Sequence, residues 1–196
     1  METSSAKSSE KFVVRFWGVR GSIACPGSQT VKYGGNTPCV EMRVQDHLLI
    51  FDGGTGIRNL GQSVRNEGNI TAHIFLSHLH WDHIQGIPFF EPAFVPGNTL
   101  TFYGAQSANG ASLEDCLVGQ MRDPHFPVPM AGMSARVTFR EISAGSSVCV
   151  GDVIVRSAPL NHPGGCLGYR VEYKEKACAY ITDTELGDQT LEKNVL

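Results

Sequence analysis

The segment FLSHLHWDHIQG (residues 75–86) places three histidines and one aspartate within six residues. His78 and His80 are two residues apart, so in an extended segment both imidazoles project to the same side. Asp82 and His83 follow where the chain can turn into a helix, whose first turn would present both side chains inward. One short loop can therefore offer two imidazoles to one cation, and a carboxylate with an imidazole to a second.

The types of these side chains indicate which cations they suit. Neutral imidazole and carboxylate groups favour zinc, manganese or iron, whereas an imidazole-rich set disfavours calcium and magnesium. The segment therefore predicts a site for divalent metal ions, with zinc favoured and manganese or iron as alternatives. A solvated polar loop is the simpler interpretation, but packing alone does not require this concentration of histidines.

Two more candidate ligands follow other apolar segments. His162 comes just after VIVRSAP (residues 153–159), and the glycines beyond it allow close approach of the backbone. Asp183 ends the last hydrophobic run, ACAYITD (residues 177–183). Because open sheets gather their sites beyond the carboxyl ends of strands, both residues are expected to join the histidine cluster. Taken singly, His162 is equally well a loop histidine, and Asp183 a helix cap or turn residue.

The chain that must position these residues reads as a mixed α/β (α+β) domain. Apolar and alternating runs predict strands, and helical spacing predicts helices near 56–66 and 110–121. Asp52, just before two glycines, is expected either to orient a metal-bound histidine or to serve as a turn residue. Strands are expected at 11–19, 39–44, 47–52, 72–77, 100–104, 136–142, 146–151, 153–159, 168–173 and 177–183.

Length and composition set the remaining bounds. The 196 residues are enough for one domain with a sizeable core, here 11–196, after a disordered tail at 1–10. The net charge of −3 gives no overall attraction to nucleic acid or to an anionic membrane. The polar N-terminus lacks a signal peptide's apolar core and no long apolar run occurs, which predicts a cytoplasmic protein without a membrane span. The six cysteines form no CxxC pair and are expected as free thiols.

The block HLHWDH resembles the HxHxDH motif of the metallo-β-lactamase superfamily. Five further segments resemble the branch that contains ribonuclease Z and the phosphodiesterase of carbon–phosphorus lyase pathways: FWGVRGS, GGNTPCV, LLIFDGGTGIR, LNHPGGCLGYR and AYITDTE. The resemblance implies an αββα sandwich with a binuclear metal centre at its edge.

The resemblance also implies how the ligands are shared between two metal ions. His78, His80 and His162 would hold one ion, Asp82 and His83 the second, and Asp183 would bridge them. A hydroxide between the metals is the expected nucleophile. Asp82 has an expected catalytic role as well, because it can accept a proton from the attacking water.

One feature of the family pattern has no counterpart here. The pattern includes a histidine after the bridging aspartate, and His162 is the last of the seven histidines. The expectation is therefore a sandwich that is incomplete at its C-terminus, either because the chain is truncated or because a second chain supplies the rest. The segment GDQTLEKNVL (residues 187–196) is expected to begin a helix.

These observations combine into one functional expectation with two rivals. The expected protein is a metal-dependent hydrolase of a small-molecule or nucleotide phosphodiester, such as a cyclic nucleotide or an RNA-type linkage. His80, where some relatives carry glutamate and di-iron redox chemistry, favours hydrolysis. The rivals are a hydrolase of thioesters, lactones or β-lactams on the same fold, and a non-catalytic binding module with an incomplete metal site. The resemblance also makes a homodimer an expectation.

Overall fold

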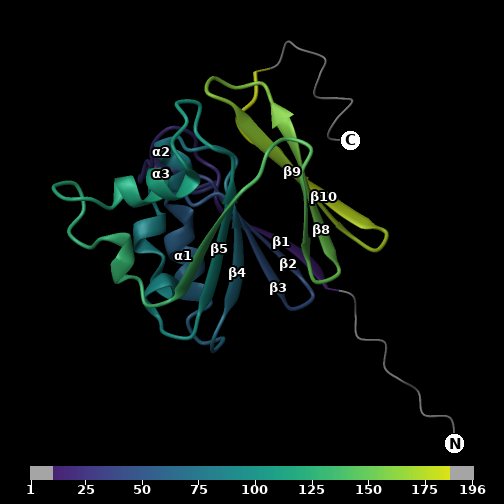
Figure 1. Cartoon of the computed structure of the whole chain (residues 1–196), viewed down its shortest axis with the longest axis horizontal. Helices are drawn as coiled ribbons and strands as arrows, with labels where there is room; N and C mark the ends of the chain where they lie inside the picture. The colour runs from purple at the N-terminus through teal and green to yellow at the C-terminus, as the bar shows by residue number, and fades with distance from the viewer. Residues whose placement is uncertain (1–10, 186–196) are drawn as a thin grey trace, which may run out of the picture.

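The computed structural model describes residues 11–185, which form two β-sheets packed face to face (Figure 1). Sheet A contains six strands in the order β1-β2-β3-β4-β5-β6, and sheet B contains four in the order β10-β9-β8-β7. In Figure 1 the helices lie on the face of sheet A that points away from sheet B. The expected N-terminal tail (1–10) and C-terminal helix (187–196) lie outside the described residues.

The strands of sheet A are β1 (Phe12–Gly18), β2 (Cys39–Val44), β3 (His47–Phe51), β4 (Thr71–Phe75), β5 (Thr99–Gly104) and β6 (Arg136–Glu141). The first three are antiparallel, and β3 to β6 are parallel. Sheet B is antiparallel and consists of β7 (Ser147–Val150), β8 (Val153–Leu160), β9 (Cys166–Tyr173) and β10 (Lys176–Tyr180). The helices are α1 (Gly56–Ser63), α2 (Trp81–Ile84) and α3 (Leu113–Gln120), with short 3₁₀ turns at Ser28–Thr30, Ile87–Phe89, Glu91–Phe94 and Met130–Gly132.

Every strand expected from the sequence is present, with small shifts at the ends. The helix expected at 110–121 begins later, at Leu113, because Ser112 caps it: the Ser112 hydroxyl accepts a hydrogen bond from the N–H of Asp115 at 3.0 Å. The expectation of free thiols is confirmed for all six cysteines. None of the helices in residues 11–185 is long and apolar enough to cross a membrane.

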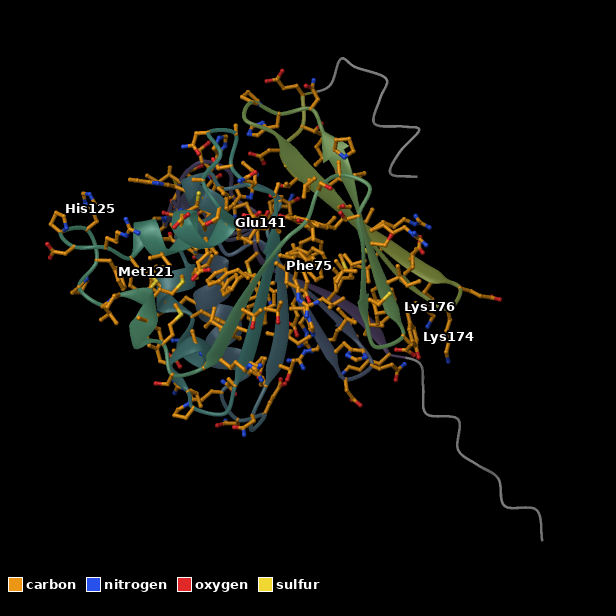
Figure 2. The ribbon with its side chains drawn as sticks, in the orientation of Figure 1. Phe75, Met121, His125, Glu141, Lys174 and Lys176 are labelled. Atoms are coloured by element: carbon orange, nitrogen blue, oxygen red, sulfur yellow. The ribbon has the colours of Figure 1, made fainter. Side chains whose placement is uncertain are left out.

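Two apolar cores result from the alternation of side chains along sheet A. Ile50 and Ile74 face the helices, whereas their neighbours Phe51 and Phe75 face sheet B. Figure 2 shows Phe75 between the sheets and Met121 in the helical layer. Because both faces of the sheet are covered, the central strands read as nearly continuous apolar runs.

A stack of aromatic rings fixes the two sheets to each other. The Phe75 ring stacks on Phe51 at 5.4 Å and on Tyr103 at 4.5 Å between centroids. From sheet B, the fully buried Tyr169 meets Phe75 edge-on, and its hydroxyl donates to the Leu76 carbonyl at 2.6 Å. This bond holds the chain at the end of β4, directly before the histidine cluster.

The glycines after β3 let two backbone segments touch. The Gly53 N–H donates to the His83 carbonyl at 2.7 Å, and the Gly86 N–H donates to the Gly53 carbonyl at 2.9 Å. A Cβ added at Gly54 would lie 2.2 Å from the Asp82 carbonyl oxygen. Helix α2, which carries two candidate ligands, is therefore seated directly on this glycine pair.

We expect Gly54→Ala to lower the free energy of unfolding by about 2 kcal/mol or more, because the added methyl group meets backbone that cannot move aside. The matched control is Gly119→Ala in α3, where an added Cβ meets nothing within 4 Å. That change is expected to raise the free energy of unfolding by about 0.5–1 kcal/mol, since alanine restricts the unfolded chain. Urea unfolding measures both, and an equal effect of the two variants would contradict the close approach.

Candidate metal centre

The histidine cluster lies in the turn between β4 and α2. His80 is the extended residue that precedes α2, and the predicted change from extended chain to helix is confirmed there. Asp82 and His83 on the first turn are buried, whereas Trp81 between His80 and Asp82 is 80% exposed. The short helix therefore turns two candidate ligands inward and the indole outward.

Three imidazoles form a first group. The Nε2 atom of His78 lies 2.9 Å from Nδ1 of His80, which lies 3.2 Å from Nε2 of His162. Two nitrogen ligands at about 2.0–2.1 Å from a tetrahedral zinc are about 3.3–3.4 Å apart, so the group fits one such ion. His162 reaches this position from the loop after β8.

A second group is built from His83 and two carboxylates. The His83 Nε2 atom lies 3.4 Å from Oδ2 of Asp82 and 3.5 Å from Oδ2 of Asp183. The same Asp183 oxygen lies 4.0 Å from Nε2 of His78 and 3.9 Å from Nε2 of His162. One oxygen of Asp183 therefore faces both groups.

The state of the His83 ring is an independent test of whether the group suits a cation. The side chain is fully buried, and its Nδ1 atom lies 2.7 Å from the Asp52 carboxylate. Its Nε2 atom is buried and has no hydrogen-bond partner within residues 11–185. Because Nδ1 faces Asp52, Nε2 is the ring atom that faces the carboxylates of Asp82 and Asp183. An imidazole nitrogen without a hydrogen-bond partner beside two carboxylates is a donor set for a divalent cation.

Asp52 is a hydrogen-bonded hub behind the ligands. Its Oδ1 accepts from the Ser77 N–H at 2.7 Å, and its Oδ2 accepts from the hydroxyls of Ser77 at 2.8 Å and Tyr180 at 2.7 Å, as well as from His83. The residue has φ of 62°, a left-handed conformation that aspartate adopts more readily than most side chains. The sequence left two interpretations of Asp52 open, and both features are present: Asp52 contacts His83, and its backbone has a turn conformation.

Electrostatics separate the two buried histidines. Burial, followed by repulsion from His83, lowers the pKa of His78 to about 4, so this imidazole is neutral near pH 7. Burial also acts to lower the pKa of His83, but the hydrogen bond and charge of Asp52, with the charges of Asp82 and Asp183, raise it overall. A bound divalent cation would compete with a proton for the His83 ring, because the surrounding carboxylates attract either positive charge.

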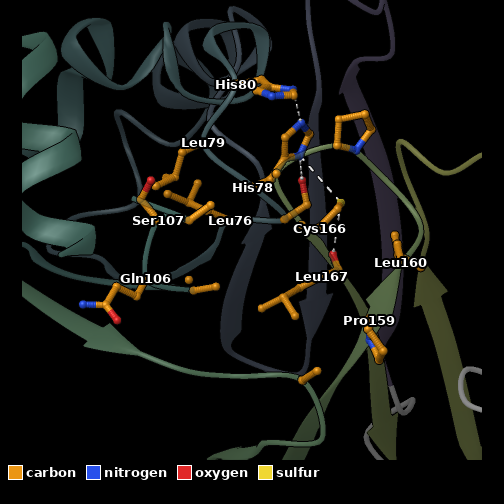
Figure 3. A pocket seen from close by; sticks show the side chains of 18 residues that line it. Leu76, His78, Leu79, His80, Gln106, Ser107, Pro159, Leu160, Cys166 and Leu167 are labelled. Carbon is orange, nitrogen blue, oxygen red and sulfur yellow. Dashed lines mark hydrogen bonds between the residues drawn. The ribbon is translucent and has the colours of Figure 1, made fainter. Parts of the chain in front are cut away.

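Contacts from distant segments complete the surroundings of the ligands. The Ser22 N–H, in the glycine- and proline-rich loop after β1, donates to Oδ2 of Asp82 at 2.7 Å. Cys166 is buried, with Sγ 3.6 Å from Nδ1 of His78, and burial raises its thiol pKa to about 12 (Figure 3). Sequence reasoning assigned no role to Ser22, Ser77 or Tyr180, since single serines and tyrosines near strand ends carry no distinguishing signal.

The structure brings all six candidate ligands into one cluster. Two sets have ligand atoms that all lie within 4.8 Å of one another, one made of His78, His80 and His162 and the other of His78, His83 and Asp183. Asp82 lies beside the second set through its contact with His83. Which metal each side chain holds stays a prediction.

Comparison with known proteins agrees with this geometry. Residues 47–195, well over half of the chain, match the family described as the beta-lactamase superfamily domain. The chain belongs to the β-lactamase superfamily. Ribonuclease BN of Escherichia coli strain SE11 is 32% identical over 136 residues, which cover 67% of this chain and 41% of that enzyme. Ribonuclease BN of Cronobacter sakazakii is 28% identical over 133 residues, or 66% of this chain and 40% of that protein.

Solved structures of the superfamily share the fold. The metallo-β-lactamase fold protein YhfI from Bacillus subtilis matches with a TM-score of 0.63 and 20% identity, over 89% of this chain and 64% of that one. The short form of human tRNase Z matches with a TM-score of 0.61 and 18% identity, over 87% and 68%. The predicted metallo-β-lactamase fold is thus confirmed, and the described residues supply both sheets with helices on one side.

We expect Asp52→Asn to weaken zinc binding by about 10–100-fold, because the amide no longer fixes the His83 ring as a charged acceptor does. Asparagine tolerates the left-handed backbone at this position, so the change isolates the carboxylate charge. The control is Asp46→Asn at the exposed turn between β2 and β3. Competition with a chromophoric zinc chelator measures the affinity, and unchanged binding in Asp52→Asn would refute the positioning role.

Proposed function

We propose that this chain is the metal-binding part of a hydrolase that cleaves phosphodiesters with the help of two divalent metal ions, zinc being the favoured metal. The observation that carries the proposal is the position of Asp183, whose Oδ2 lies within 3.5–4.0 Å of imidazole nitrogens from both ligand groups. A single carboxylate oxygen shared by two groups of donors suits a pair of cations. A merely structural zinc site would close around one ion.

The donors divide between the two ions as follows in this proposal. The three imidazoles of His78, His80 and His162 would hold the first ion, Asp82 and His83 would hold the second, and Asp183 would contribute to both. When bound, such a pair of ions lowers the pKa of water and neutralises charge on a phosphate group. The chain spans only about two fifths of the ribonuclease BN length, and the three imidazoles of the first group all lie within it.

The protein's own groups have defined tasks around that centre. Asp52 holds the proton of His83 at Nδ1 and so keeps Nε2 available. The Ser22 N–H holds Oδ2 of Asp82 in place, and the Asp82 carboxylate would accept a proton from water. The low pKa of His78 keeps that imidazole from binding a proton in place of a cation near pH 7.

The choice of a phosphodiester rests on the relatives. Ribonuclease BN and tRNase Z carry ribonuclease names, and further fold neighbours are a diphosphatase of the PhnP family and yeast PDE1, with TM-scores of 0.60 and 0.57. Residues 11–185 contain no helix that could span a membrane. The cytoplasmic location stays a prediction. A homodimer, or a second chain as partner, also stays a prediction.

We expect the chain to hydrolyse bis(4-nitrophenyl) phosphate when Zn²⁺ or Mn²⁺ is added, and His80→Ala to lower the rate by about two orders of magnitude or more. His125→Ala is the matched control, since that exposed histidine lies at the outer edge of the helical layer (Figure 2). A β-lactam is assayed in parallel. Turnover of the lactam without any turnover of the diester would replace the proposal with its rival on the same fold.

Metal content gives a second, activity-independent test. Elemental analysis of the zinc-loaded chain should find about two ions per chain, and His80→Ala should leave about one. A chain that binds no zinc would support the non-catalytic binding module instead. Full metal content in His80→Ala would remove this residue from the ligand set.

A further inference from the structure

A cavity of about 430 Å³ adjoins the first ligand group on the side of β5 and β8 (Figure 3). Its walls come from the ends of β4 and β5 and from the loop between β8 and β9, with His78 and His80 at one end. In Figure 3 these two histidines lie at the top, Gln106 and Ser107 on one side, and Pro159 and Leu160 on the other. The volume falls in the range of about 300–1,000 Å³ that accommodates small organic ligands.

The chemistry of the lining restricts what can enter. Among the residues of 11–185 that line the cavity there is no aspartate, glutamate, lysine or arginine. Leu76, Leu79, Leu160 and Leu167 give it an apolar surface. A charged group placed there would lose water without gaining a partner, which is costly. An uncharged ring would instead remove apolar surface from water.

The few polar groups in the walls already have partners inside the protein. The Gln106 amide donates to the Gly110 carbonyl at 3.0 Å, within its own loop. The Ser77 hydroxyl donates to Asp52, and the Cys166 thiol lies against His78. The walls therefore present more apolar than polar surface. Polar contacts come from the two imidazoles at one end and from the Gln106 and Ser107 side chains on one side.

The loop between β8 and β9 leaves space on its side of the cavity. Gly164 and Gly165 both have positive φ, and a Cβ added at either would meet nothing within 4 Å. Ala108 and Ala144, both exposed, add small side chains at the rim. The positive φ disfavours any larger residue at the two glycines, and the alanines are small, so the cavity remains open beside the candidate ligands.

We infer that this cavity binds an uncharged ring, an aryl group or a nucleobase with its sugar, attached directly to the phosphate that the metal centre holds. The inference rests on the proposed function, because the shared histidines place the ring next to the scissile phosphate. The inference narrows the substrate to phosphate esters in which the group that enters the cavity carries no charge. A nucleic-acid strand whose next phosphate group would have to enter the cavity is a disfavoured substrate.

Binding to the zinc-loaded chain tests the inference by calorimetry with two probes, inorganic phosphate and phenyl phosphate. We expect phenyl phosphate to bind roughly tenfold more tightly or better, since the ring leaves water. Ala108→Trp, which fills the rim, should abolish this difference and leave the affinity for inorganic phosphate unchanged. The control is Ala177→Trp, at an exposed position of β10, which should preserve the difference.

A charged probe sharpens the test. 4-Carboxyphenyl phosphate should bind no more tightly than inorganic phosphate, because its carboxylate would find no cation in the cavity. Equal affinities for phenyl phosphate and inorganic phosphate would overturn the inference, as would an equal gain for both aryl probes. If Ala108→Trp does not fold, Ala144→Trp fills the cavity from another part of the rim. If phenyl phosphate still binds more tightly than inorganic phosphate by the full factor in the filled variant, the inference is also overturned.

Phenol separates failure of this inference from failure of the proposed function. If inorganic phosphate does not bind, the phosphodiester proposal fails. Phenol should then still shift the NMR signals of the Leu160 and Leu167 methyl groups, and Ala108→Trp should remove those shifts, which would leave the ring site standing. Absence of the phenol shifts as well would overturn the ring site.

Discussion

The buried carboxylate of Asp52 is the group on which the rest of the site depends. An isolated buried charge is strongly unfavourable, so this one persists only because four hydrogen bonds converge on it. Two come from Ser77 after β4, one from His83 on α2 and one from Tyr180 at the end of β10. A single carboxylate therefore ties together sheet A, sheet B and the helix that carries the second ligand group, and movement of any of them would leave it underpaired.

The same hub determines which nitrogen of each buried histidine is free. His83 donates its Nδ1 proton to Asp52 directly. The Ser77 hydroxyl gives its own proton to Asp52, so its oxygen can accept the Nδ1 proton of His78, 3.0 Å away. With Nδ1 held in this way, the Nε2 atoms of both rings face Asp183, at 4.0 Å for His78 and 3.5 Å for His83. One buried carboxylate thus orients a histidine from each of the two ligand groups.

Sequence reasoning predicted much of this arrangement because it depends on short-range patterns. The apolar runs HLLIF and TAHIF indicate buried strands, and the spacing of His78, His80, Asp82 and His83 indicates a strand end followed by a helical turn. The contacts of Ser22 and Tyr180 with the site could not be predicted in the same way. Each joins segments far apart in the chain, and their geometry depends on how closely two sheets and a loop approach one another, which no local pattern records.

Strand direction explains why so many functional groups gather at one edge. Strands β3, β4 and β5 are parallel, so Asp52, the histidine cluster and the loop with Gln106 all emerge from carboxyl ends at the same edge of sheet A. In sheet B, β8 and β10 are both antiparallel to β9 and therefore run in the same direction as each other, so His162 and Asp183 also leave the sheet together. Packing the two edges against each other gathers the ligands from the ends of β4, β8 and β10 and leaves the apolar cavity between the ends of β5 and β8. The cluster of candidate ligands and the cavity beside it accordingly have one structural cause, the meeting of aligned strand ends from two sheets.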